Sequence, residues 1–271
     1  MTEILAPSTQ GIDRAAGLLR DGALVAFPTE TVYGLGADAR NDRAVAGIFA
    51  AKGRPSFNPL IVHVVDMDAA RRIAEFCPLA ERLAAAFWPG PLTLVLPARS
   101  KAGLSALVSA GLPSVALRVP AHPLAQSLLR AFGGPVAAPS ANPSGRISPT
   151  RAAHVLAGLD GAIAAVIDGG DCAVGLESTI IGFDPDPVLL RPGGLPTEAI
   201  EDCLGAPLAL PAVTTGKVRP NAPGQLDSHY APAAALRLNV DAPRPGEVWL
   251  GFGGGAAAAL DALIDNIAAA L

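Results

Sequence analysis

Residues 23–36 read ALVAFPTETVYGLG and join a short apolar run to a polar loop. The run at 23–27 predicts a strand that ends at Pro28, because proline has no N–H to offer a strand ladder. Two glycines close the segment. Four hydrogen-bonding side chains precede them within five positions: Thr29, Glu30, Thr31 and Tyr33. The segment is neither a Walker A loop nor a GxGxxG fingerprint. It predicts either a loop that belongs to a site or an ordinary strand-to-helix connection.

Outward from this segment, short apolar runs alternate with stretches of helical periodicity. Helices are predicted over residues 12–20, 42–52, 68–76, 79–87, 123–132 and 150–156. Further strands are predicted over residues 60–65, 92–96, 115–119, 136–138, 164–167, 179–183 and 188–190. Asn41 or Asp42 is expected to cap the second helix, and Gly53 to end it. This alternation is typical of an α/β fold with a mixed sheet, and strands without polar alternation indicate burial on both faces.

The composition is that of a folded, loop-rich chain. Of 271 residues, 51% are hydrophobic and 16% are charged, with a mean hydropathy of +0.40. These values exclude intrinsic disorder, which requires low hydrophobicity and high charge. The 29 glycines and 26 prolines predict many turns and shaped loops. The length allows one large domain, or one domain with a smaller partner.

Other features bear on location and partners. Charge-free stretches reach about 20 residues at most and contain helix breakers, so no membrane-spanning helix is expected. The first 20 residues show no apolar signal-peptide region. Cys77, Cys172 and Cys203 lack the spacing of a metal site or a disulfide framework, which predicts reduced thiols in a cytoplasmic protein. The net charge of −4 argues against general nucleic-acid binding.

The character of the chain changes after about residue 205. Residues 206–232 are rich in proline and poor in periodic apolar positions, which predicts an extended linker. One strand at 247–252 and an alanine-rich helix at 256–271 are predicted beyond it. These two elements are too little for an independent core. The predicted organisation is therefore a main domain over 8–205, a linker over 206–233 and a partial α/β domain over 234–271.

A cationic pair lies in the loop at 51–60, AKGRPSFNPL. Lys52 is predicted to end a helix, and Arg54 follows on a loop that two prolines stiffen. Such a pair could grip a polyphosphate, because lysine acts as a point charge and arginine as a planar fork. The alternative is that these cations only complement the helix dipole.

A second long loop spans 136–149, VAAPSANPSGRISP, and follows a predicted strand. Its three prolines restrict the backbone, so it can hold polar groups in place before a ligand arrives. The loop is longer than the usual connection of about 4–6 residues, which favours a function over a plain surface loop. Its polar side chains are Ser140, Asn142, Ser144, Arg146 and Ser148.

Further candidates are placed on strands. His63 lies within a predicted strand, where a single histidine is usually structural. Arg118 and Arg191 also lie in apolar strands, and buried arginines need an anionic partner. The chain has no GxSxG nucleophile elbow, no HExxH motif and no EF-hand loop. Catalysis by positioning and charge neutralisation is therefore favoured over covalent catalysis.

Taken together, these segments resemble the threonylcarbamoyl-AMP synthase family, which is built on the YrdC-like domain. The resemblance occurs in the family's order and covers about residues 8–205. The matching stretches are FPTETVYGLG (27–36), KGRPSFNPLIVHV (52–64), WPGPLTLVL (88–96), LRVPAHP (117–123), APSANPSG (138–145), GLESTI (175–180) and LLRPGG (189–194). In the linker, SHYAP (228–232) resembles the segment that precedes the second domain of long-form members. The resemblance implies a twisted mixed sheet with flanking helices, followed by a reduced or truncated Rossmann-like segment.

The resemblance also implies an activity. Members are nucleotidyltransferases that join L-threonine, bicarbonate and ATP, the last with Mg²⁺, into threonylcarbamoyl-AMP and release pyrophosphate. A transferase complex then moves the threonylcarbamoyl group to tRNA. Lys52 and Arg54 are implied to be catalytic, as neutralisers of phosphate charge. The residues implied to bind ATP are Lys52, Arg54, Asn58, Ser114, Ser140, Asn142, Ser148, Arg191 and Tyr230. The residues implied to bind L-threonine are Thr31, His63, Arg118 and Ser178, and no side chain is assigned to a metal.

Two other functions are weighed against this one. A related domain in hydrogenase maturation factors forms a carbamoyl adenylate, but those relatives carry extra domains. An RNA-binding module is the alternative of a different class, and weak RNA contact is kept among the expected partners because the fold presents a concave basic surface. The net charge and the scarcity of aromatic residues argue against RNA binding as the main role.

Overall fold

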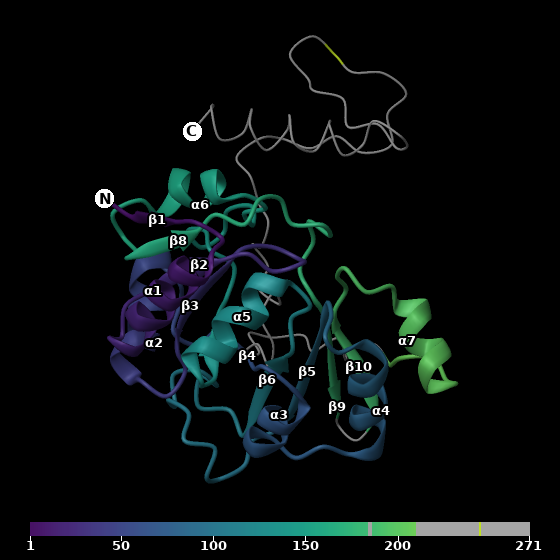
Figure 1. Ribbon diagram of the computed structural model, residues 1–271. Coiled ribbons are helices and arrows are strands. Elements are labelled where there is room, and N and C mark those ends of the chain that lie inside the picture. The colour runs from purple at the N-terminus through teal and green to yellow at the C-terminus, as the bar shows by residue number, and fades with distance from the viewer. Residues whose placement is uncertain (184–185, 210–243, 245–271) are drawn as a thin grey trace.

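The computed structural model describes residues 1–183, 186–209 and 244 (Figure 1). Most of the predicted linker, the predicted strand at 247–252, the helix at 256–271 and the domain at 234–271 lie outside the described residues. The helices are α1 (Thr9–Arg20), α2 (Asp42–Lys52), α3 (Met67–Ile73), α4 (Pro78–Phe87), α5 (Pro123–Phe132), α6 (Ala152–Leu159) and α7 (Thr197–Leu204). Within the described residues, no helix is long and apolar enough to cross a bilayer.

The described strands form one ten-stranded mixed sheet in the order β1-β8-β2-β3-β7-β4-β6-β5-β9-β10. Their bounds are β1 (Glu3–Leu5), β2 (Val25–Phe27), β3 (Gly34–Asp38), β4 (Ile61–His63), β5 (Leu92–Pro97), β6 (Ser114–Arg118), β7 (Val136–Ala137), β8 (Ala165–Ile167), β9 (Thr179–Phe183) and β10 (Pro187–Arg191). β4 and β6 run parallel, as do β5 and β9, whereas β7 runs antiparallel to both of its neighbours, β3 and β4. The predicted α/β class with a mixed sheet is confirmed.

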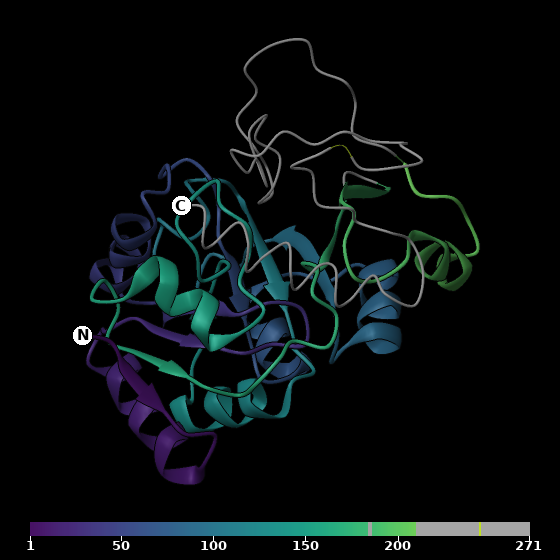
Figure 2. The same cartoon turned by 90° about the horizontal axis from the view of Figure 1, so that it is seen from above.

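Both faces of the sheet are covered by helices. Val25 and Phe27 of β2 pack with apolar residues of α1 and α5, whereas Ala26 between them packs with residues of α2. Figure 2 shows α1 and α5 together on one side of the sheet. The alternation along β2 therefore separates two apolar layers, and it explains why this strand has no polar face.

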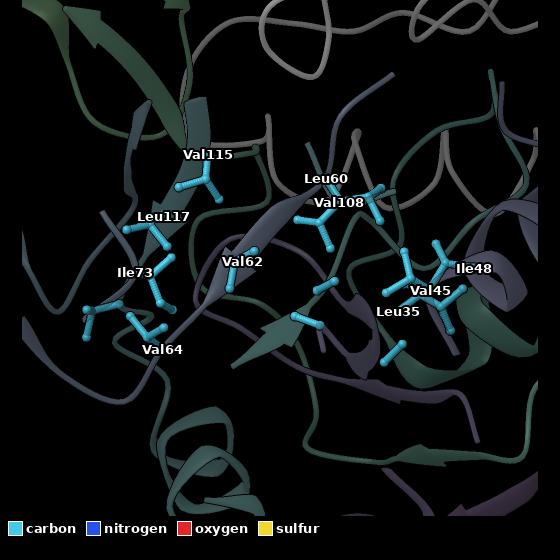
Figure 3. Close-up of a cluster of buried hydrophobic side chains, with 14 of the residues drawn as sticks. Leu35, Val45, Ile48, Leu60, Val62, Val64, Ile73, Val108, Val115 and Leu117 are labelled. Carbon is cyan, nitrogen blue, oxygen red and sulfur yellow. The ribbon is translucent and has the colours of Figure 1, made fainter. Parts of the chain in front are cut away.

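The larger core cluster lies around β3, β4 and β6 (Figure 3). Val62 and Leu117 are register partners on the parallel strands β4 and β6, and both are fully buried. The residues labelled around them are Leu35, Val45, Ile48, Leu60, Val64, Ile73, Val108 and Val115. Aliphatic side chains from α2, α3 and the sheet thus fill this layer, and they give the strand ends that carry polar residues a rigid support.

Local signals predicted several element ends correctly. Asn41 caps α2, because its Oδ1 accepts hydrogen bonds from the N–H groups of Arg43 and Ala44. Gly53 ends α2 in the left-handed conformation, at φ 59°. The predicted bounds of α5 and β9 agree with the structure to the residue.

Three elements escaped prediction: β1, β3 and α7. The segment at 27–36 is not a strand-to-helix connection, because β3 returns antiparallel to β2 and makes it a hairpin. Glycine has low strand propensity, so two glycines hid β3. One of them is required by packing, since a Cβ on Gly36 would lie 2.9 Å from the Phe27 ring. β1 extends the sheet ahead of residue 8, where the main domain was expected to begin.

Candidate active site

The polar segments from the sequence are joined to one another by backbone hydrogen bonds. The loop after β2 bonds to the loop at 136–149 through Tyr33 N–H to the Pro149 carbonyl at 2.8 Å and Ala141 N–H to the Tyr33 carbonyl at 2.8 Å. It also accepts from the segment before β9, where the Val174 N–H lies 2.8 Å from the Glu30 carbonyl. Segments more than a hundred residues apart in the chain are therefore held side by side.

These segments surround an open pocket with about 530 Å³ of empty volume. Seven of the predicted site residues line the pocket: Thr31, Arg54, His63, Arg118, Ser140, Ser178 and Arg191. Apolar walls come from Val32, Ile61, Ala138 and Pro139. Residues that were assigned separately to threonine and to ATP therefore share one cavity.

His63 and Arg118 lie side by side at the ends of β4 and β6. The two residues are register partners on these parallel strands, so both are at carboxyl-terminal strand ends, where α/β sheets usually bind ligands. Arg118 donates from Nη2 to Glu30 Oε1 at 2.6 Å and from Nη1 to Thr31 Oγ1 at 2.9 Å. Its guanidinium is therefore fixed in the pocket by the loop after β2.

His63 is a neutral imidazole in this site. Its side chain is 3% exposed, and burial, with the nearby charge of Arg118, lowers its pKa to about 3. Its Nδ1 atom is buried and has no hydrogen-bond partner. A buried polar atom without a partner is costly unless a ligand completes it. His63 can therefore form one hydrogen bond to a bound molecule while the imidazole stays neutral.

Arg191 and Ser178 also line the pocket and are hydrogen-bonded to each other. Arg191 Nη2 donates to the Ser178 carbonyl oxygen at 2.8 Å and to Ser178 Oγ at 3.2 Å. Ser178 Oγ also lies 2.7 Å from Thr93 Oγ1 of β5. The turn after β10 packs tightly here, because a Cβ on Gly193 would lie 2.3 Å from the Glu177 carbonyl oxygen. The close contact explains the glycine at position 193.

Arg54 brings a second guanidinium close to Arg191. Its Nη2 donates to the Pro59 carbonyl oxygen at 2.9 Å. Burial, together with the charge of Arg191, lowers the pKa of Arg54 to about 10. A bound anion would favour the charged form of Arg54 and so offset this effect of Arg191. The part of the pocket around Arg54 and Arg191 is therefore suited to a phosphate group.

Lys52 is buried and hydrogen-bonded to the loop at 136–149. It is 3% exposed and is not among the residues that line the pocket. Its Nζ donates to the carbonyl oxygens of Ser140 and Asn142, each at 2.5 Å. Burial lowers its pKa to about 7, with a further contribution from Arg54 and an opposing one from Glu177. Lys52 thus holds the loop at 136–149 in place through two of its backbone carbonyl groups.

The other predicted ATP residues lie around this loop or on its borders. Asn142 Nδ2 donates to the Arg146 carbonyl at 2.7 Å, which closes the loop on itself. Ser148 Oγ is hydrogen-bonded to Glu177 Oε1. Asn58 is 1% exposed, and its Oδ1 has no hydrogen-bond partner. Ser114 begins β6, four residues before the pocket-lining Arg118, and is not itself among the lining residues. Tyr230 lies outside the described residues.

Sequence reasoning missed two carboxylates. Glu177 lines the pocket between Ser178 and the loop at 136–149, and Glu30 pairs with Arg118. Both residues belong to quoted motifs, but neither received a role. The signal was available for Glu30, since the run of polar residues after β2 contains it. The described residues contain no cluster of three or more His, Cys, Asp or Glu that could hold a metal ion.

Comparisons with known proteins identify the family of the chain. The Sua5_yciO_yrdC family model, described as "Telomere recombination", matches residues 17–193. The chain is 49% identical over 245 residues to the threonylcarbamoyl-AMP synthase of Bacillus subtilis, covering 90% of this chain and 70% of the relative. It is 50% identical over 233 residues to the synthase of Pyrococcus abyssi, covering 85% of this chain and 68% of the relative.

Solved structures give the same result. The crystal structure of P. abyssi Sua5 complexed with L-threonine has a TM-score of 0.81 at 48% identity, over 86% of this chain and 70% of that one. Escherichia coli YciO, at 23% identity and a TM-score of 0.65 over 71% of this chain and 96% of that one, shares the fold. A full-length HypF structure, at 21% identity and a TM-score of 0.61 over 69% of this chain and 29% of that one, also shares it. By sequence and by structure, the chain belongs to the Sua5/YciO/YrdC family.

Proposed function

We propose that this chain is a threonylcarbamoyl-AMP synthase, a nucleotidyltransferase that joins L-threonine, bicarbonate and ATP. The observation that carries this proposal is the shared pocket. Arg118, Thr31 and His63 line it together with two further cations, Arg54 and Arg191, of which Arg191 lies close enough to lower the pKa of Arg54. Relatives at about half identity bear this name, and one of them is known with L-threonine bound.

The part of the pocket around Arg118 and His63 is suited to the carboxylate of an amino acid. Arg118 offers a planar fork that can bind a carboxylate through two parallel hydrogen bonds. His63 stays neutral because burial lowers its pKa to about 3, so it adds a polar atom without adding charge. Thr31 and Ser178 add hydroxyl groups to the lining of the pocket. A small polar amino acid therefore finds a partner for each of its polar groups.

The chemistry requires positioning more than a protein nucleophile. The threonine amine adds to bicarbonate and loses water, which gives an N-carboxylate. An oxygen of that carboxylate then attacks the α-phosphorus of ATP, and the bond to the leaving pyrophosphate breaks. Negative charge grows on the transferring phosphoryl group and on the leaving group. Arg54 and Arg191 are placed to stabilise that charge, which is the main contribution of proteins to phosphoryl-transfer reactions.

We further propose that Mg²⁺ accompanies the ATP. Mg²⁺ is usually bound by substrate phosphates and only one or two carboxylates, so its site needs no larger cluster of protein ligands. Glu177 is the carboxylate that lines the pocket on the side of Lys52, so it is the protein residue suited to hold the ion. The ion would supply charge neutralisation at the phosphates.

We also place this enzyme in the cytoplasm, upstream of a transferase complex that moves the threonylcarbamoyl group to tRNA. Cys77, Cys172 and Cys203 are free thiols in the structure, which suits a reducing compartment. A mixed carboxylic–phosphoric anhydride is a reactive acyl donor, so its formation requires a consuming transferase nearby.

One assay tests the function directly. Pyrophosphate release is measured with purified protein, Mg-ATP and bicarbonate, with and without L-threonine. We expect release that depends on both threonine and bicarbonate. Release that needs carbamoyl phosphate instead would indicate carbamoyl-adenylate formation. Salt-dependent RNA binding without any ATP turnover would overturn the enzymatic proposal in favour of an RNA-binding role.

A further inference from the structure

We propose that Glu30 is a positioning residue that orients Arg118 to bind the carboxylate of the amino-acid substrate. The inference rests on the proposed function and assigns a role to a residue outside the predicted site. It follows from the contacts of both side chains: Arg118 lines the pocket together with His63, and Glu30 is hydrogen-bonded to Arg118.

The contacts of Arg118 leave its guanidinium partly available. A guanidinium has five N–H donors. Three protein acceptors engage Arg118: Thr31 Oγ1 at 2.9 Å, Glu30 Oε1 at 2.6 Å and the Gly90 carbonyl at 3.3 Å. Two N–H groups therefore remain, one on each Nη atom. That number matches the two oxygens of a carboxylate in a bidentate pair.

Glu30 itself is held at both oxygens. Oε1 accepts from Arg118, and Oε2 accepts from the Ala121 N–H at 3.0 Å. The Glu30 carbonyl accepts from the Val174 N–H at 2.8 Å. The side chains of Arg118 and Glu30 are only 4% and 12% exposed. A carboxylate held at its second oxygen by a backbone N–H, on a residue whose backbone carbonyl is also hydrogen-bonded, can fix the plane of the guanidinium against it.

The electrostatics argue for orientation over attraction. A carboxylate beside Arg118 repels a second, incoming carboxylate, so the charge of Glu30 by itself weakens substrate binding. What Glu30 contributes is a defined fork geometry, since bidentate recognition depends on the orientation of the guanidinium plane. A purely charge-balancing Glu30 and a positioning Glu30 therefore predict opposite effects of its neutralisation on substrate affinity.

The test compares L-threonine with L-threoninamide, which lacks the carboxylate charge. Binding of each is measured by calorimetry in wild type and Glu30→Gln. We expect wild type to prefer threonine strongly, and the preference to fall about tenfold in Glu30→Gln, the equivalent of one charge-assisted hydrogen bond. The KM for ATP should stay unchanged. A merely structural role would lower the melting temperature and leave the threonine preference intact.

Two further variants complete the design. Glu30→Asp keeps the charge but shortens the reach, so positioning predicts a reduced preference, whereas charge balance alone predicts an unchanged one. Asp38→Asn is the matched control, because Asp38 pairs with Arg40 at 2.8 Å at the far end of β3. An unchanged or greater preference for threonine in both Glu30 variants would overturn this inference alone. Absence of threonine binding by wild type would instead overturn the proposed function.

Discussion

The Nζ atom of Lys52 lies 2.5 Å from the backbone carbonyl oxygen of Asn142, which is 90 positions further along the chain. The Ser144 N–H in turn donates to the Lys52 carbonyl at 2.7 Å. The last residue of α2 therefore binds the loop at 136–149 with its side chain and its backbone. Lys52 therefore helps to set the shape of this loop.

Replacement of Lys52 should reveal that connection. Lys52→Met removes the donors to Ser140 and Asn142, so we expect turnover to fall by about 10²–10³-fold, as when one preorganised donor is lost from an active site. Amide hydrogen exchange of residues 140–148 should become faster in the absence of ATP. Lys101→Ala is the control, since Lys101 is exposed. Equal losses in the two variants would contradict the role of Lys52.

Arg54 should affect the nucleotide and not the amino acid. Arg54→Ala removes one of two neighbouring cations, so we expect the KM for ATP to rise at least tenfold, the loss of about one charge-assisted hydrogen bond. Threonine affinity should stay within a factor of about two, since Arg118 is retained. Arg146→Ala is the matched control, because Arg146 is an exposed arginine of the neighbouring loop. Steady-state kinetics with each substrate varied in turn would measure the difference.

His63 predicts a specific pH dependence of stability. Its folded-state pKa of about 3 lies below the ordinary value of 6.5, so between these pH values the unfolded chain binds a proton that the folded chain does not. Stability should therefore fall as the pH drops below 6.5. The loss attributable to His63 should be about 2–3 kcal/mol by pH 4.5, at 1.36 kcal/mol per pKa unit. Urea unfolding of wild type and His63→Gln at pH 7 and pH 4.5 measures it. A pH dependence that is identical in both proteins would refute the prediction.

The turn after β10 tolerates no side chain at position 193. A Cβ on Gly193 would lie 2.3 Å from the Glu177 carbonyl oxygen, so Gly193→Ala must displace the backbone beside Ser178. We expect a destabilisation of about 1–3 kcal/mol, as for overpacked sites, together with weaker threonine binding. Gly17→Ala is the control, because Gly17 lies within α1 and a Cβ there meets nothing within 4 Å. That variant should gain about 0.5–1 kcal/mol from helix propensity. Thermal melts of both variants would show whether the two substitutions change the stability in opposite directions.

Much of the fold was predictable because its signals are local. Pro123 in the first turn and Gly133 after the last turn mark the ends of α5. Asn41 and Gly53 mark the ends of α2 in the same way. Elements without such signals were missed. β3 is encoded by its pairing with β2 and β7, and its glycines serve close packing, so no propensity argument could find it.

The sequence by itself determined the chemistry of this protein: the cations, hydroxyls and amides on proline-stiffened loops, and the order of motifs that places it in its family. Tertiary structure alone decided which of these groups face the pocket. Arg54 and Arg118 do, Lys52 turns to the loop behind it, and Glu30 and Glu177 join the site. The reason is physical, because the hydrogen-bond partners that aim these side chains lie as much as 90 positions away in the chain.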